Sequence, residues 1–245
     1  MESNPLAEKA PVGEFSGKAL GRVFRCFTEP RTVFAEIAAR PTVFWVLLLT
    51  VVLSLGVQLV LAPRIDMEAT VLQGISRAGK EIPEEQVREA VNTANRFRTF
   101  GVVLAPLGAL AVTLLLGGVY FLALKVTGLE AEYPPVLSAV AHAGFPPSLA
   151  QSVLLSVVAS TREPFPAQEI PRLLKSNVAA FLPEDAPRVL SALGGVLDVF
   201  NVWYWLLLAW GLAAVGGVSL RKSAGVVAVL WGAWALLQVV LALLR

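Results

Sequence analysis

Histidine, cysteine and charge are all scarce in this chain. Among 245 residues there is one histidine, His142, and one cysteine, Cys26, and only 16% of residues are charged. A lone cysteine forms no internal disulfide, and one histidine, one cysteine and scattered carboxylates make no metal cluster. A net charge of +2 is too small to indicate nucleic-acid binding. We therefore expect no metal, no other cofactor and no nucleic-acid partner.

The common catalytic motifs are also missing. The sequence has no GxSxG, no P-loop, no HExxH and no GxGxxG followed by an acidic partner. The polar residues of its apolar segments do not combine an acid, a base and a nucleophile at catalytic spacing. We therefore predict no catalytic residues and a protein that is not an enzyme. The first 40 residues lack the apolar core and cleavage site of a signal peptide, so membrane insertion is expected to depend on the spans themselves.

Apolar residues are abundant instead, at 56% of the chain. They gather in five windows without charge: 41–63, 99–124, 133–161, 199–220 and 223–244. Each window holds the roughly 20 residues needed to cross a bilayer as a helix, and each is apolar on all sides, unlike a helix of a soluble bundle. The sequence predicts an all-α polytopic membrane protein with a membrane domain over 42–245. Its five transmembrane helices are expected at about 42–62, 100–123, 135–160, 199–219 and 224–244.

Five spans place the two termini on opposite sides of the membrane. Of the 20 Lys and Arg residues, nine fall on the N-terminal side and eleven on the other, ten of them in the long loops 64–98 and 162–197. Long loops contribute little to the positive-inside rule, so the short segments decide. They predict a cytoplasmic N-terminus.

The segment before the first span divides in two. Residues 1–16 are expected to form a mobile tail. Residues 17–41 predict two short helices whose apolar faces are separated by arginines, the faces being Leu20, Phe24 and Phe27, then Val33, Phe34 and Ile37. Such helices lie at the membrane interface with basic groups toward anionic lipid, or pack against the spans of their own protein. In the loop that follows the first span, Pro83 with Glu84 and Glu85 predicts a helix start that runs toward the second span.

The second span repeats a small residue at every fourth position: Gly101, Ala105, Ala109, Thr113 and Gly117. Such a ridge lets helix backbones approach closely, which favours association within lipid. We predict that this ridge is a packed face. Its partner is either another span of the same chain or a second copy in a homo-oligomer.

The third span contains His142 followed by Pro146 and Pro147. The prolines lack the N–H groups that would bond the carbonyls of His142 and Ala143, so a bend is expected there. The bend either shapes the bundle or, with the imidazole and the intramembrane amides Gln151 and Asn201, forms a functional polar site of the kind transporters build from broken helices.

Asp198 opens the fourth span, three residues before Asn201. The carboxylate is suited to the N-terminus of a helix. In the predicted topology the start of this span shares a membrane face with the start of the second. We therefore predict an ion pair between Asp198 and Arg98 or Arg96, because a charge at that depth is less costly when paired.

Two segments resemble a known family: "FTEPRTVFAEIAARPTVFWVLLL" and "LDVFNVWYWLLLAWGLAAVGGVSLRKSAGVVAVLWGAW". The second is the more specific, with an Asp-x-Phe-x-x-Trp entry, a Gly after the aromatic run and a Ser-x-x-Lys hinge at Ser219 and Lys222. They resemble the bacterial branch of the Yip domain family, integral membrane proteins whose eukaryotic members interact with Rab/Ypt GTPases. The resemblance implies five spans, a cytoplasmic N-terminus and the bacterial inner membrane. The eukaryotic N-terminal Asp-Leu-Tyr-Gly-Pro motif is absent here, and the third span reads "HAGFPP" without tyrosine.

Two functions follow from these observations. The first is a non-enzymatic membrane scaffold or organiser that interacts with lipids and with other membrane proteins, as the small-residue ridges and the resemblance imply. The second is a transporter of small molecules, ions or lipids through the proline-broken third span. The absence of an inverted repeat favours the scaffold.

Overall fold

The computed structural model describes residues 12–79, 82–129, 131–183 and 186–244. Within these ranges all regular secondary structure is helical, and the prediction of an all-α protein is confirmed. The α-helices are α1 (Val12–Arg25), α2 (Pro30–Ala39), α3 (Phe44–Leu61), α4 (Met67–Arg77), α5 (Glu84–Val126), α6 (Tyr133–Ser160), α7 (Ile170–Leu173), α8 (Arg188–Val196), α9 (Val199–Val215) and α10 (Leu220–Leu243). Short 3₁₀ turns η1 (Ala62–Arg64), η2 (Ala167–Glu169) and η3 (Val178–Phe181) lie between them.

Four helices are long and apolar enough to cross a membrane: α3, α5, α6 and α10. The helix at the predicted fourth span, α9, is apolar but has only 17 residues. At 1.5 Å per residue it is about 25 Å long, less than the roughly 30 Å of a hydrocarbon core. The count of five spans therefore stays a prediction.

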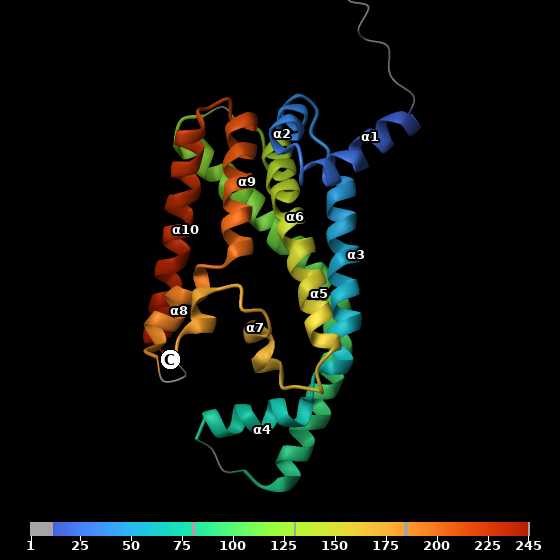
Figure 1. The fold of residues 1–245 in the computed structure, drawn as a ribbon, viewed down its shortest axis with the longest axis vertical. Helices are drawn as coiled ribbons and strands as arrows, with labels where there is room; N and C mark the ends of the chain where they lie inside the picture. The colour runs from blue at the N-terminus through green and yellow to red at the C-terminus, as the bar shows by residue number, and fades with distance from the viewer. Residues whose placement is uncertain (1–11, 80–81, 130, 184–185, 245) are drawn as a thin grey trace, which may run out of the picture.

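Helix α6 lies at the centre of the bundle, with α3, α5, α9 and α2 packed around it (Figure 1). Its apolar window is more buried than that of any of the other three long helices. Because protein rather than lipid covers much of its surface, α6 tolerates serine, histidine and several alanines that a lipid-exposed helix would replace with larger apolar residues. The central position of α6 explains its mixed composition.

Helices α8 and α9 pack against different parts of α10. Helix α9 packs along the N-terminal part of α10, where Ser223 donates to the Ala209 carbonyl (2.7 Å) and the rings of Trp205 and Trp231 are 5.0 Å apart. Helix α8 lies beside the C-terminal part of α10, so α9 begins part-way along it (Figure 1). The change from α8 to α9 at Leu197 and Asp198 therefore occurs inside the bundle.

Helix α5 extends far beyond the bundle. Its 43 residues begin at Glu84, directly after Pro83, which confirms the predicted helix start and its continuation into the second span. Pro106 lies inside the helix and is buried. Helix α4 packs beside the N-terminal part of α5, at the end of the molecule opposite α1 and α2 (Figure 1). We call residues 67–77 and 84–98 the arm.

Helices α1 and α2 dock against the other end of the bundle. Helix α1 begins at Val12, so residues 12–16 of the predicted mobile tail are helical, and residues 1–11 lie outside the described residues. In α2, Val33, Phe34 and Ile37 are fully buried. This half of the interfacial segment packs against its own protein, whereas Phe24 is half exposed.

Charged groups join these two helices. Glu36 accepts from the Nε of Arg22 (2.8 Å) and from Nη1 of Arg25 (2.9 Å). Partial burial acts to raise the pKa of the Glu36 carboxyl, but the hydrogen bonds and charges of the two arginines outweigh it, so the pKa lies below its ordinary value. Arg31 of α2 lies 5.0 Å above the ring of Trp210 in α9, a cation–π contact that ties α2 to the bundle.

The small-residue ridge of α5 contacts α6 most closely at Gly117. A Cβ at Gly117 would lie 2.8 Å from Cδ1 of Leu137 and 3.4 Å from its Cα, whereas a Cβ at Gly101 or Gly118 would meet nothing within 4 Å. The ridge therefore approaches α6 at its C-terminal end and leaves open space at its N-terminal end.

We predict that Gly117→Ala lowers the free energy of unfolding by about 1–3 kcal/mol, because the methyl group overpacks the contact with Leu137. Gly118→Ala, one residue away, is the matched control and should be neutral or stabilising by up to about 1 kcal/mol, the helix-propensity gain. Denaturation in mixed micelles followed by tryptophan fluorescence measures both. Equal effects of the two substitutions would contradict the close approach.

Candidate functional site: a polar pocket inside the bundle

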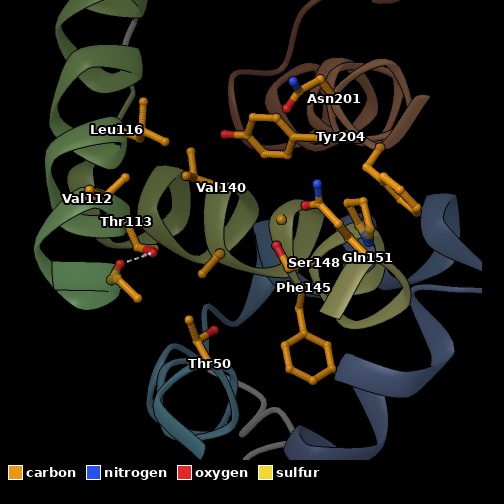
Figure 2. A pocket seen from close by; sticks show the side chains of 15 residues that line it. Thr50, Val112, Thr113, Leu116, Val140, Phe145, Ser148, Gln151, Asn201 and Tyr204 are labelled. Atoms are coloured by element: carbon orange, nitrogen blue, oxygen red, sulfur yellow. Dashed lines mark hydrogen bonds between the residues drawn. The ribbon is translucent and has the colours of Figure 1, made fainter. Parts of the chain in front are cut away.

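A pocket of about 280 Å³ lies where α3, α5, α6 and α9 meet. Figure 2 shows side chains of all four helices around it, with Tyr204 of α9 pointing toward Leu116 of α5 and Val140 of α6. The pocket is lined by Thr50, Ala109, Val112, Thr113, Leu116, Val140, Ala141, Gly144, Phe145, Pro147, Ser148, Gln151, Phe200, Asn201 and Tyr204. We call it the bundle pocket. Its lining is mostly apolar, contains several hydroxyl and amide groups and has no charged residue.

Some polar groups of this lining have a hydrogen-bond partner and others do not. Thr113 donates to the Ala109 carbonyl (2.8 Å), a bond drawn in Figure 2, and Thr50 donates to the carbonyl of its own helix one turn earlier. The hydroxyl of Tyr204 is buried without a hydrogen-bond partner. In the described part of the chain, the side chains of Gln151 and Asn201 are exposed and form no hydrogen bond. A buried polar group is costly to leave unpaired, and in this lining that cost falls on Tyr204.

A second pocket adjoins the first on the side of α7 and α8. We call it the loop pocket; it measures about 260 Å³ and is lined by Gln151, Leu155, Ile170, Pro171, Leu174, Ser176, Asn177, Gly195, Asp198 and Asn201. Gln151 and Asn201 line both pockets. The two amides therefore stand on the wall that the pockets share, at the level where α9 begins.

Asp198 caps α9 and is only 6% exposed. Its carboxylate accepts from the backbone N–H groups of Phe200 (2.9 Å) and Asn201 (3.3 Å), and the hydroxyl of Ser176 donates to its other oxygen. The positive end of the α9 dipole lies at the same point. These partners compensate a buried negative charge.

The predicted ion pair of Asp198 with Arg98 or Arg96 is wrong. Among the described residues, neither arginine lies within 4.0 Å of this carboxylate. The guanidinium of Arg98 donates instead to the carbonyls of Ala62 and Ile65 (both 3.4 Å), just beyond the end of α3. The prediction assumed that α9 begins at the membrane boundary, whereas it begins inside the bundle, at a different depth from Arg98.

His142 lies on another side of α6 and does not line the bundle pocket. It is 1% exposed, and its Nδ1 is 2.8 Å from the carbonyl of Ser138, one turn earlier. Ser138 donates in turn to the Thr42 carbonyl (2.9 Å), which fixes the connection between α2 and α3 to α6. The Nε2 of His142 is buried without a partner. The imidazole thus belongs to the contact between α6 and the N-terminal segment.

The third span is not divided into two helices at the prolines, and the bend predicted there stays a prediction. Helix α6 is continuous from Tyr133 to Ser160 and passes through Pro146 and Pro147. The His142 carbonyl, which Pro146 cannot bond, accepts instead from the thiol of Cys26 (3.4 Å). Burial raises the pKa of this thiol to about 12, so it stays protonated and able to donate. Another part of the chain thus supplies a donor for the carbonyl that Pro146 frees.

The structure therefore divides the predicted site residues into three groups. Pro147, Gln151 and Asn201 line the bundle pocket, Asp198 lines the loop pocket, and His142 and buried Pro146 lie outside both. Tyr204 was not identified from the sequence as a pocket residue. The sequence feature that could have identified Tyr204 is a hydroxyl group among aromatic residues within an apolar window.

The family model of the Yip1 domain matches residues 24–242. The chain belongs to the Yip1 domain family. The match begins within α1 and ends within α10, so it includes both pockets and the arm.

A curated relative supports this membership. The chain is 29% identical over 203 residues to "Membrane protein YknW" of Bacillus subtilis (strain 168), an alignment that covers 83% of this chain and 81% of the relative. No solved structure matches. The chain is thus a membrane protein of the Yip1 domain family.

We predict that Asp198 and Ser176 are energetically coupled. In a double-mutant cycle, Asp198→Ala and Ser176→Ala should show a coupling of about 0.5–3 kcal/mol, as residues in one hydrogen-bonded network do. The cycle of Asp198→Ala with Arg98→Gln should be additive within about 0.5 kcal/mol. Unfolding in mixed micelles measures both. Coupling to Arg98 without coupling to Ser176 would restore the ion pair.

Proposed function

We propose that this protein is a non-enzymatic membrane scaffold that holds another membrane protein at the arm. The main support for this proposal is the length of α5. At 1.5 Å per residue, 43 residues extend about 65 Å, twice the roughly 30 Å hydrocarbon core. The charged N-terminal part of α5 therefore lies beyond the membrane, where it pairs with α4 in a structure that projects from the bundle (Figure 1).

The base of the arm is held firmly. The side chain of Asp66 caps α4 by accepting from the N–H of Ala69 (2.9 Å), and Thr70 accepts from the N–H of Ala167 (2.9 Å). The two hydrogen bonds of Arg98 hold α5 to the end of α3. A surface held in this way loses little conformational entropy when a partner binds, which favours a binding role.

The arm contains a groove between its two helices, lined by Glu68, Leu72, Glu84, Glu85, Val87, Arg88, Val91 and Asn92. Leu72, Val87 and Val91 give it an apolar part, and three of its four charged residues are glutamates. This combination fits an amphipathic helix of a partner that carries Lys or Arg beside its apolar face. Such a partner would be another membrane protein with a segment at the membrane surface.

We place the scaffold in the bacterial cytoplasmic membrane, with α9 completing a fifth span, α1 and α2 on the cytoplasmic side and the arm on the opposite side. The charge bias of the short segments supports this orientation, and the Bacillus relative supports the membrane. Contact with lipid is expected over the exposed apolar faces of α3, α5 and α10. A homo-oligomer is compatible with the same faces.

Cysteine accessibility tests the orientation. In a Cys26→Ala background, Ser76→Cys in the arm and Lys222→Cys at the start of α10 both place a thiol at an exposed position. A membrane-impermeant maleimide applied to intact spheroplasts should label the first and spare the second until the membrane is permeabilised. The reverse pattern would invert the proposed topology.

Photo-crosslinking in native membranes tests the scaffold role. A photoreactive amino acid in place of Leu72 should give one discrete adduct, and one in place of Thr93, which is exposed on the arm outside the groove, should give none. Glu84→Gln with Glu85→Gln should reduce the adduct several-fold, because a basic partner loses its charged neighbours. Glu89→Gln, outside the groove, is the matched control. Diffuse adducts from both positions, unaffected by these substitutions, would contradict a partner site.

A further inference from the structure

We propose that the bundle pocket binds the uncharged, polyhydroxylated headgroup of a neutral lipid, of the monoacylglycerol class. The proposal is independent of the arm and of any partner bound there. It starts from the hydroxyl and amide groups of a mostly apolar lining that contains no charged residue.

The lining has unused hydrogen-bonding capacity of two kinds. Gln151 and Asn201 each offer an amide N–H₂ donor and a carbonyl acceptor, and the buried Tyr204 hydroxyl can both donate and accept. A vicinal hydroxyl pair also donates and accepts, so it matches the hydrogen-bonding chemistry of these side chains. A charged headgroup would meet no opposite charge here and would carry the full cost of desolvation.

The size of the pocket fits a headgroup rather than a whole lipid. Its volume of about 280 Å³ equals the liquid volume of about nine waters, which is enough for a glycerol group and the first carbons of a chain. Val112 belongs to the lining and is 56% exposed, so the pocket is not closed at α5. We place the exit of the acyl chain beside Val112.

The loop pocket supplies a second route. Because Gln151 and Asn201 line both pockets, a small soluble polyol could reach the same amides from the side of α7 and α8. The carboxylate of Asp198 does not offer a free charge on this route, since it is bonded by Ser176 and by the start of α9. The shared chemistry is a neutral group with adjacent hydroxyls, and its two sources are a lipid and free glycerol.

The test uses the full chain in phospholipid nanodiscs and a monoacylglycerol that carries a photoreactive group and an alkyne tag in its acyl chain. We expect saturable labelling of α5, α6 or α9 near the pocket, displaced by unlabelled monooleoylglycerol but not by oleic acid, which lacks the hydroxyl pair. Displacement by free glycerol at similar concentrations would assign the site to a soluble polyol, and displacement by monooleoylglycerol alone would assign it to a lipid.

Variants separate recognition from folding. Gln151→Leu and Asn201→Leu should each reduce saturable labelling about tenfold, the factor that corresponds to roughly 1.4 kcal/mol. Gln238→Leu removes an amide from α10, outside the bundle pocket, and should change nothing. Ala109→Leu fills the cavity without removing a polar group and should also reduce labelling. Thermal unfolding confirms that each variant is folded.

Three outcomes would overturn the proposal. Labelling that does not saturate would mean that the probe reports only the surrounding lipid. Displacement by oleic acid as efficient as that by monooleoylglycerol would mean that the hydroxyls are not recognised. Wild-type labelling in folded Gln151→Leu and Asn201→Leu would mean that the amides do not contact the headgroup.

Discussion

The packing of α6 against its neighbours is the constraint on which the remaining structure depends. Lipid removes most of the hydrophobic difference between exposed and packed helices, so close contact must come from small residues and from hydrogen bonds. Both are present around α6. Gly117 of α5 meets Leu137, and a Cβ at Gly211 of α9 would lie 3.1 Å from both Ala139 and the ring of Phe34. Ser138 and the His142 carbonyl bind the N-terminal segment.

The requirement that backbone groups be satisfied inside a membrane explains one contact that the sequence could not predict. Pro146 leaves a carbonyl without its helical donor, which by itself indicates a break. The thiol of Cys26, 116 residues away in sequence from His142, supplies a donor instead. A partner so distant in sequence leaves no periodic pattern. The sequence therefore predicts that Pro146 leaves a carbonyl without its helical donor, but it does not predict that the Cys26 thiol bonds this carbonyl.

The sequence also did not indicate the depth in the bundle at which each helix begins. Charge-free windows located the helices to within a few residues, and Pro83 with the two glutamates after it predicted the start of α5. Windows do not report where in the bilayer a helix begins. The segment 162–197 carries charges and prolines, yet α8 packs along α10, so Asp198 lies inside the bundle. The sequence therefore predicted Gln151 and Asn201 as separate polar residues. It did not predict that they share one wall of two pockets, or that Tyr204 lines the bundle pocket.

The buried proline of α5 has a mechanical consequence. Pro106 has no N–H to bond the carbonyl four residues earlier, and proline positions are where long helices bend most easily. It separates the arm from Ala109, Thr113 and Leu116, which form one wall of the bundle pocket. Pro106 thus divides α5 into two unequal segments. We expect a sideways force on the arm to bend α5 at Pro106 before it displaces the pocket wall, which packs closely against α6 at Gly117.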